Sequence, residues 1–399
     1  MHTMWTQRDR KSGERHAHRR TATGAVLAVA VLLTACTATA NLAGSSGGDR
    51  NGATSSTAPA PGPAPATAKP ALVGLIDMGV QNAYQTGQPF PTTDPSSLDA
   101  YAGAFGGIVV NESWSQLEPS SGVEQWAPLD QSLAAVTAWN TAHPSTPLGV
   151  KLRIFAGRSA PGWVTAQSGT VTIVVHGHAD SVGRWWTPPF ESAWHDFQQA
   201  LAARYDTDPL VRQVSVSSCS SSTGEPFVVS GARASQDNLK AAGWTLQAQE
   251  QCLSGALSDY SGWKRTPVTF AFNPLDTPSG PDAAFTQQVM QSCVASAAAG
   301  GPHCVLGNND LSPSAAQGHA SPVYAQIDTL AARTPPPAVY FQTVGTQVTC
   351  ATMAVATSHH ASSVELWPPR GSYEGFAAIP VATLTAWDTA LAAGRSITC

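Results

Sequence analysis

Two glutamates at the ends of predicted strands are the residues of this chain best placed for acid–base chemistry. Glu225 follows the predicted strand Val211–Ser217, and Glu365 lies within the predicted strand Ser363–Leu366. A carboxylic acid that is partly removed from water keeps its proton near neutral pH and can donate it to a leaving oxygen. A second carboxylate can then assist the same reaction. The two side chains can cooperate only if the fold brings these strand ends together.

Each glutamate also has a structural interpretation. Glu225 could lie at the N-terminus of a helix, where the helix dipole favours a negative charge. Glu365 could instead form a buried ion pair with Arg153 or Arg370. The carboxylates that could replace Glu365 in a reaction are Glu112, Asp276 and Asp310.

Aromatic and polar side chains near the other strand ends could bind a ligand. Arg153 could orient a carboxylate or bind a hydroxyl group, and a buried salt bridge is its alternative. Asn309, beside Asp310, could equally be a turn residue. The amides that supply hydrogen bonds without charge are Asn273, Asn309 and Gln342. The tryptophans at or beyond strand ends, each of which could stack on a ring-shaped ligand or pack in the core, are Trp114, Trp163, Trp186 and Trp367.

We expect no metal ion and no cofactor. The spacing of His176 and His178 resembles that of a pair of metal ligands. Alternate residues of any strand point the same way, however, so a solvated hairpin is the preferred interpretation. No two cysteines have zinc-finger spacing. No glycine-rich phosphate loop follows the first predicted strand, which disfavours a doubly wound open sheet.

The elements that must position these residues predict a (β/α)8 barrel. Eight short apolar or β-branched runs alternate with helical stretches, as in parallel βαβ units, and eight strands can close a barrel whose loops converge at one end. A hairpin-like insert, Thr170–His178, follows the third run. The predicted strands are Leu72–Met78, Gly107–Asn111, Leu148–Phe155, Val211–Ser217, Val268–Phe272, Cys304–Leu306, Ala338–Gln342 and Ser363–Leu366. The predicted helices are a short one near Ser96–Phe105, then Pro128–Thr141, Phe190–Tyr205, Gln236–Ser254, Ala283–Ala299, Ser321–Ala332 and Val381–Ala393.

The N-terminus predicts export. A basic stretch precedes the apolar run Gly24–Leu33, which is too short to span a bilayer, so residues 1–35 are expected to be a signal peptide. The segment Leu33-Thr34-Ala35-Cys36 resembles the lipobox of bacterial lipoproteins, which implies lipidation of Cys36 and attachment to the outer face of the cell membrane; an ordinary secretory signal is the alternative. Residues 36–70 are rich in Ala, Thr, Ser, Gly and Pro and predict a tether, and residues 71–399 predict the folded domain.

Six cysteines remain beyond Cys36, an even number in a chain sent to an oxidising compartment, which predicts disulfides. Sequence neighbours bracket successive barrel segments, so the predicted pairs are Cys219–Cys252, Cys293–Cys304 and Cys350–Cys399. The charged fraction is 12% and the net charge is −5, which disfavours a nucleic acid partner.

Three stretches resemble barrels of glycoside hydrolase clan A, which includes cellulases and β-galactosidases. They are Asn111–Trp126, Lys151–Trp163 and Trp185–Pro226, the last of which ends in Thr223-Gly224-Glu225-Pro226. Together they cover the first half of the domain, whereas the second half matches only in its rhythm of strands and helices. The resemblance implies an enzyme that cleaves glycosidic bonds, with carbohydrate as its partner and no cofactor. Together with the predicted lipid anchor, this predicts a cell-surface enzyme, and we expect it to be a monomer.

The resemblance also assigns roles, with one departure. Glu225 matches the acid/base glutamate that follows the fourth strand, but Gln342 stands on the seventh strand, where the clan usually carries its nucleophilic glutamate. Glu365 is therefore the predicted partner carboxylate. A separation of about 5 Å between the two carboxyls implies retention of configuration, and about 6.5–9.5 Å implies inversion. A catalytically silent carbohydrate-binding barrel and a structural envelope lipoprotein with both glutamates in ion pairs are the alternatives.

Overall fold

The computed structural model describes residues 67–79, 89–175, 178–227, 233–277, 280–344, 348–369 and 374–399, all of which belong to one compact unit, Pro63–Cys399. The predicted signal peptide, Cys36 and nearly all of the predicted tether lie outside the described residues, as do His176, Arg370 and the side chain of His178. Lys69, placed by the sequence at the end of the tether, donates from Nζ to the carbonyl oxygens of Asp208 and Val211 at 2.6 and 2.8 Å. The chain is thus attached to the barrel just before its first strand.

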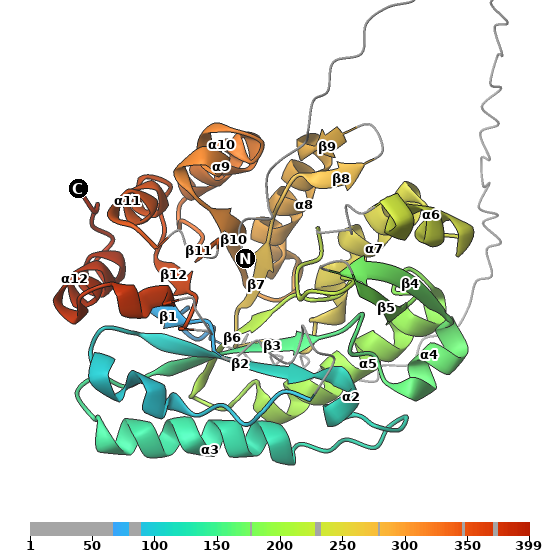
Figure 1. Ribbon diagram of the computed structural model, residues 1–399, viewed down its shortest axis with the longest axis horizontal. Coiled ribbons are helices and arrows are strands. Elements are labelled where there is room, and N and C mark those ends of the chain that lie inside the picture. The colour runs from blue at the N-terminus through green and yellow to red at the C-terminus, as the bar shows by residue number, and fades with distance from the viewer. Residues whose placement is uncertain are drawn as a thin grey trace, which may run out of the picture. The chain divides into compact units, whose positions relative to one another are not determined.

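Eight parallel strands close into a barrel, which confirms the predicted (β/α)8 architecture (Figure 1). Each strand pairs with the barrel strands before and after it in the chain, and the last pairs with the first. All eight coincide with predicted runs, because each run is apolar enough to be buried on both faces. The barrel strands are β1 (Gly74–Asp77), β2 (Gly107–Ser113), β3 (Gly149–Phe155), β6 (Val211–Ser215), β7 (Val268–Ala271), β10 (Cys304–Leu311), β11 (Val339–Thr343) and β12 (Ser363–Leu366).

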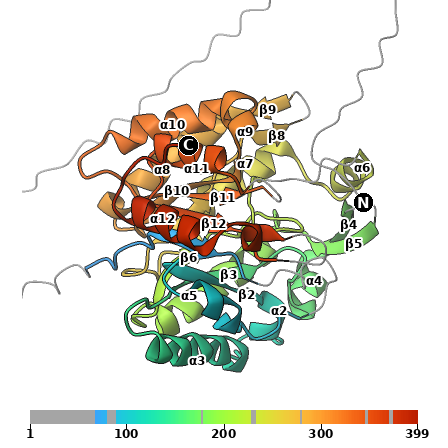
Figure 2. The same cartoon turned by 60° about the vertical axis from the view of Figure 1, so that its left-hand side comes forward.

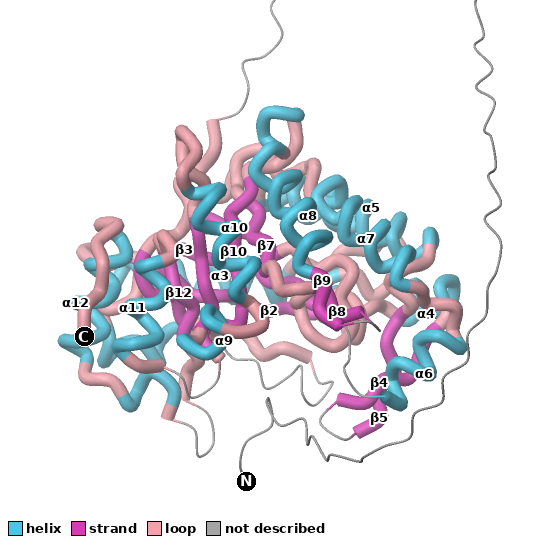
Figure 3. Tube along the Cα trace, turned by 90° about the horizontal axis from the view of Figure 1, so that it is seen from above, coloured by secondary structure: helices cyan, strands magenta, loops and turns pink. Residues whose placement is uncertain are grey.

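Helices surround the barrel strands (Figure 3). Trp114 and other large side chains pack in the layer between strands and helices, which forms the main core. None of the described helices is long and apolar enough to cross a membrane. The helices are η1 (Pro95–Tyr101), α2 (Trp114–Leu117), α3 (Ala127–Ala142), α4 (Gly162–Ser168), α5 (Pro188–Tyr205), α6 (Arg233–Ala241), α7 (Leu246–Asp259), α8 (Ala283–Ala295), η2 (Ala297–Ala299), α9 (Pro313–Gln317), α10 (Ser321–Ala331), α11 (Cys350–Ser358), η3 (Gly375–Ala378) and α12 (Val381–Ala392).

Two antiparallel hairpins decorate the barrel. The predicted insert is longer than expected and consists of β4 (Thr170–Val175) and β5 (His178–Gly183), which lie beside α6 (Figure 2). Ser235 of α6 accepts a hydrogen bond from the backbone nitrogen of Val174 at 2.7 Å. The second hairpin, β8 (Leu275–Thr277) with β9 (Gly280–Asp282), was not predicted.

The helix predicted over Gln236–Ser254 is wrong in one respect, because the structure divides it into α6 and α7. Gly243 between them has φ +87°, a left-handed conformation that interrupts a helix and that glycine adopts at little cost. The adjacent Trp244 is buried, so the break also inserts a large side chain into the core.

Three disulfides form the pairs that the sequence predicted. Cys219–Cys252 joins the loop after β6 to α7, with the two Cα atoms 5.7 Å apart. Cys293–Cys304 joins α8 to β10, and Cys350–Cys399 joins α11 to the C-terminal residue. The first of them fixes the loop that carries Glu225.

Candidate active site

Two buried side chains, those of Gln249 and Arg153, contact the loop that carries Glu225. Gln249 of α7 is fully buried and donates from Nε2 to the carbonyl oxygens of Cys219 and Pro226, at 3.0 and 3.1 Å. Gly224 lies directly over Arg153, since a Cβ atom at Gly224 would be 3.3 Å from Arg153 Cδ. No motif in the sequence indicates this role for Gln249. Buried donors to loop carbonyls of this kind fix a backbone that would otherwise be free to move.

Two amides orient the carboxyl group of Glu225, a residue of intermediate burial. Gln342 Nε2 donates to Glu225 Oε1 at 3.4 Å, and Asn309 donates a second hydrogen bond. Burial raises the pKa of Glu225 above its ordinary value, even though hydrogen bonds from Asn309 and Gln342 and the charge of Arg153 lower it. Glu225 therefore holds its proton more strongly than a glutamate in water.

A chain of asparagines determines which way Asn309 faces. Asn273 Nδ2 donates to Asn309 Oδ1, and Asn308 Nδ2 donates to Asn273 Oδ1 at 3.0 Å. The backbone nitrogen of Asp310 donates to Asn308 Oδ1 at 2.9 Å, which fixes the first member of the chain. Because Asn309 Oδ1 is already an acceptor, its amide nitrogen is the end that meets Glu225. The predicted Asn273 and Asn309 are thus brought together with Gln342 around one carboxyl group.

Glu365 occupies a different environment, inside the barrel. Its two oxygens accept hydrogen bonds from Lys151 Nζ and Arg153 Nη2, each at 2.5 Å, and its side chain has 0% exposure. Burial raises the pKa of Glu365, but the charges of Arg153 and Lys151 outweigh this effect and hold that pKa below its ordinary value. Glu365 is therefore an ionised carboxylate in a buried ion-pair network, the structural alternative that the sequence left open for it.

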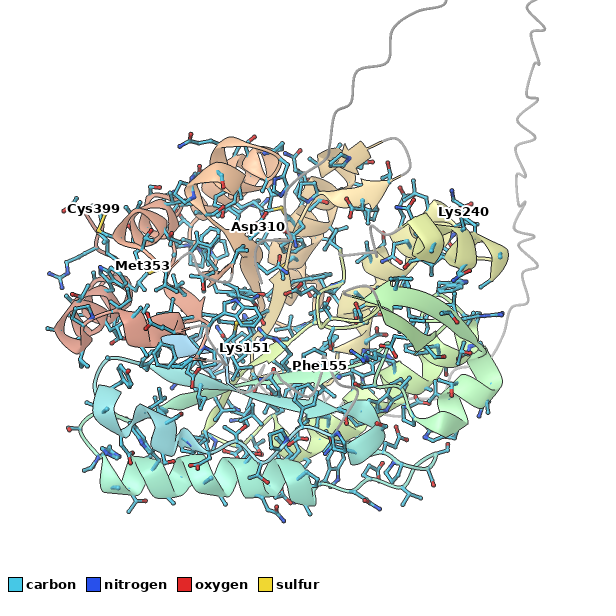
Figure 4. The ribbon with its side chains drawn as sticks, in the orientation of Figure 1. Lys151, Phe155, Lys240, Asp310, Met353 and Cys399 are labelled. Atoms are coloured by element: carbon cyan, nitrogen blue, oxygen red, sulfur yellow. A yellow bond between two sulfur atoms is a disulfide. The ribbon has the colours of Figure 1, made fainter. Side chains whose placement is uncertain are left out.

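Lys151 was missed by the sequence analysis, although it stands two residues before Arg153 and so shares its face of β3. Its ammonium group lies 3.6 Å from the centroid of the Tyr340 ring, among the barrel strands (Figure 4). Burial lowers the pKa of Lys151 to about 8. Lys151, Arg153 and Glu365 together form what we call the charged floor of the barrel.

The other carboxylates face elsewhere. Asn111 and Arg153 are register partners whose side chains face the barrel interior, so the next residue, Glu112, faces the helices. Glu112 is fully buried near Ser132 of α3, and burial raises its pKa to about 8. Asp310 Oδ2 lies 2.7 Å from His319 Nε2, at the end of β10 (Figure 4). Asp276 is exposed on the β8–β9 hairpin.

The predicted tryptophans divide into one core residue and three partly exposed ones. Trp114 is fully buried, with its ring centroid 5.0 Å from that of Trp194, and therefore serves the core. Trp163 and Trp367 are partly exposed, and their indole nitrogens donate to the carbonyl oxygens of Glu118 and Thr343. Trp186 is also partly exposed, and its ring packs edge-on against Trp185.

The described residues contain no group of three or more His, Cys, Asp or Glu side chains that could hold a metal ion. The arrangement around Glu225 can donate a proton, accept hydrogen bonds and supply the positive charge of Arg153. The carboxyl group of Glu225 accepts hydrogen bonds from the neutral amides of Gln342 and Asn309, whereas both oxygens of Glu365 accept hydrogen bonds from cations. The chemistry immediately around Glu225 is therefore that of a carboxylic acid with polar neighbours.

No protein-family model and no curated protein matches this chain. Among solved structures, endo-glycoceramidase II from Rhodococcus sp. in its ganglioside GM3 complex is 14% identical, with a TM-score of 0.47 over 78% of each chain. The lactosyl-enzyme intermediate of the same enzyme gives 14% and 0.43, over 78% of this chain and 77% of that one. GH5_18 from Bifidobacterium longum subsp. longum gives 13% and 0.41, over 74% of this chain and 69% of that one.

Similarity at this level of identity says nothing about the reaction, and the barrel architecture of this chain rests on the pairing of its own eight strands.

Proposed function

We propose that this chain is a glycoside hydrolase-like enzyme that binds carbohydrate at the carboxyl end of its barrel and uses Glu225 as a general acid. The observation that supports this most directly is the environment of Glu225. The residue is not fully buried, its carboxyl group is oriented by Gln342 and Asn309, and burial raises the pKa of that group. A carboxylic acid that keeps its proton can protonate the oxygen of a leaving sugar.

In this proposal Glu365 acts as a positioning residue. Both of its oxygens already accept charge-assisted hydrogen bonds, from Lys151 and from Arg153, and its side chain is fully buried. Attack on a sugar carbon would require the carboxylate to leave two cations unpaired in the barrel interior, which is costly. Its contribution is to hold Arg153 beneath the loop of Glu225.

The test is hydrolysis of glycans by the wild type and by Glu225→Gln, with Glu124→Gln as the control. Glu124 is an exposed glutamate, so its substitution removes the same charge at the surface. We expect Glu225→Gln to lose cleavage of any glycan that the wild type cleaves, and Glu124→Gln to retain it. Unchanged turnover by Glu225→Gln would overturn the role of this residue.

A catalytically silent carbohydrate-binding barrel is the second candidate. It is favoured by Gln342, an amide that cannot act as a nucleophile, and by the occupied oxygens of Glu365. Binding of a glycan without release of any product, in the wild type and in Glu225→Gln alike, distinguishes this function from the first.

We further propose that the barrel acts as a monomer at the outer face of the cell membrane, attached through a lipid on Cys36. The support for the anchor is the sequence Leu33-Thr34-Ala35-Cys36 after an apolar run. Partition of the expressed full chain into a detergent phase, compared with Cys36→Ser, tests it. An equal distribution of the two proteins would exclude the lipid anchor.

A further inference from the structure

One nitrogen of Arg153 has no hydrogen-bond partner among the residues that the structure describes. Nη2 donates to Glu365, but Nη1 makes no hydrogen bond to any described residue, although the arginine is only 5% exposed. A buried donor without a partner costs about 1–3 kcal/mol, and more when it is charged. Most buried polar groups in native proteins are satisfied, so an unpaired guanidinium nitrogen at a candidate site calls for a partner, which an ordered water or a ligand atom can supply.

The position of Arg153 connects this nitrogen to the proposed acid. Gly224 packs on its aliphatic stem, and its charge is close enough to Glu225 to lower the pKa of that residue. The loop of Glu225 thus covers the aliphatic stem of Arg153, and Glu365 fixes the Nη2 atom of the same arginine. An acceptor bound to Nη1 would therefore lie in the neighbourhood of Glu225.

The charges around this position do not balance when Glu225 is protonated. Lys151 and Arg153 are both cations, and Glu365 is the carboxylate that pairs with them. With Glu225 in the protonated form that a general acid requires, one positive charge is left over in a buried place. A neutral sugar hydroxyl can accept a hydrogen bond from Nη1, but it leaves this charge uncompensated. An anionic group satisfies both the donor and the charge.

We propose, on the basis of the function proposed above, that the sugar bound beside Glu225 carries an anionic oxygen group, and that Arg153 Nη1 binds this group. The shared chemistry is an oxygen anion on the sugar, which the carboxylate of a uronic or sialic acid, a sulfate or a phosphate could each supply. Arginine suits it, since its planar guanidinium can hold Glu365 with one nitrogen and the ligand with the other, which a lysine ammonium cannot do with the same geometry.

The test is binding to a glycan array with matched neutral, uronic, sialylated, sulfated and phosphorylated members, followed by calorimetry on the tightest acidic glycan and its neutral counterpart. We expect the wild type to prefer the acidic member at least tenfold, and the array to identify which anion it is. Arg153→Lys should reduce that preference about tenfold or more. Arg204→Lys should leave it unchanged, because Arg204 is half exposed and pairs with Asp130 on the surface.

Glu225→Gln provides the second variant, which keeps the test decisive if Arg153→Lys does not fold. It replaces the acid by a neutral amide of the same size, so it should lose hydrolysis but keep or increase the preference for the acidic glycan. A folded Arg153→Lys with an unchanged preference, or a wild type that prefers the neutral glycan, overturns this inference and leaves the proposed function standing. No binding to any glycan overturns both.

Discussion

Removal of the negative charge of Glu365 is the sharpest test of how the barrel interior is built. Glu365→Gln keeps the size and shape of the side chain, but it leaves Lys151 and Arg153 facing a neutral amide. The three side chains have exposures of 0%, 0% and 7%, so water cannot replace the lost charge. The substitution therefore changes the electrostatics of the charged floor while its packing stays nearly the same.

The expected cost follows from the burial of all three groups. Removal of one partner of a buried ion pair typically destabilises a protein by about 3–5 kcal/mol, because an uncompensated charge remains. Two cations share Glu365, so the upper part of this range is expected. For a domain of about 330 residues, in which the entropy of unfolding is about 2.1 cal/mol/K per residue, a loss of about 3–5 kcal/mol lowers the melting temperature by about 4–7 °C.

Urea unfolding monitored by tryptophan fluorescence measures this cost, with Asp130→Asn as the matched control. Asp130 pairs with Arg204 at 2.6 Å, but their side chains are 41% and 45% exposed. An exposed pair contributes at most about 1 kcal/mol, so the control should lose no more than that. If Glu365→Gln lost as little as Asp130→Asn, the charged floor would not be the buried network that its geometry indicates.

Three further predictions concern other parts of the chain. Gln342→Glu places a second carboxylate beside Glu225, and repulsion between the two raises the pKa of the pair. The folded variant then holds a proton that the unfolded chain releases above about pH 4.5, so the free energy of unfolding should decrease from pH 4 to pH 8 more steeply in the variant than in the wild type. Glu112→Met removes a buried carboxyl whose pKa of about 8 lies above the unfolded value, so the variant should gain about 1–3 kcal/mol at pH 8 and little at pH 4 in the same assay. The double variant Cys219→Ser/Cys252→Ser removes the disulfide that links residues 33 positions apart in the sequence. Its free energy of unfolding, measured in urea without reductant, should be lower than that of the wild type by about 3–4 kcal/mol.

The barrel itself was predictable because its signals are local. Each of the eight strands is a short apolar or β-branched run, and the alternation with helices leaves few other architectures. The break between α6 and α7 was harder to foresee, because a single glycine such as Gly243 is tolerated in many helices. Helix α11 was missed because Cys350–Ser358 contains no charged residue and is made mostly of small and apolar side chains, so it lacks an amphipathic pattern.

The site was predictable only where strand ends converge. Glu225, Asn309 and Gln342 end or follow three different strands, and barrel geometry requires such residues to gather at one end. The charged floor could not be predicted in the same way, since β3 and β12 are separated by β1 and β2 in the sheet. Alternation along β3 shows that Lys151 and Arg153 share a face, but it does not show which residue on the far side of the barrel they meet.

The charged floor limits what Glu225 can achieve alone. General acid catalysis by one positioned side chain contributes about 10²–10⁴-fold to a rate, whereas whole enzymes reach about 10⁶-fold or more. The last two strands of the barrel, β11 and β12, supply no free second carboxylate beside Glu225. Gln342 on β11 is an amide, and Glu365 on β12 is held by two cations. In the proposed enzyme, the remaining acceleration comes from binding and orientation of the sugar, to which we propose that Arg153 contributes through Nη1. Tight binding with slow turnover is therefore the kinetic behaviour that this arrangement predicts.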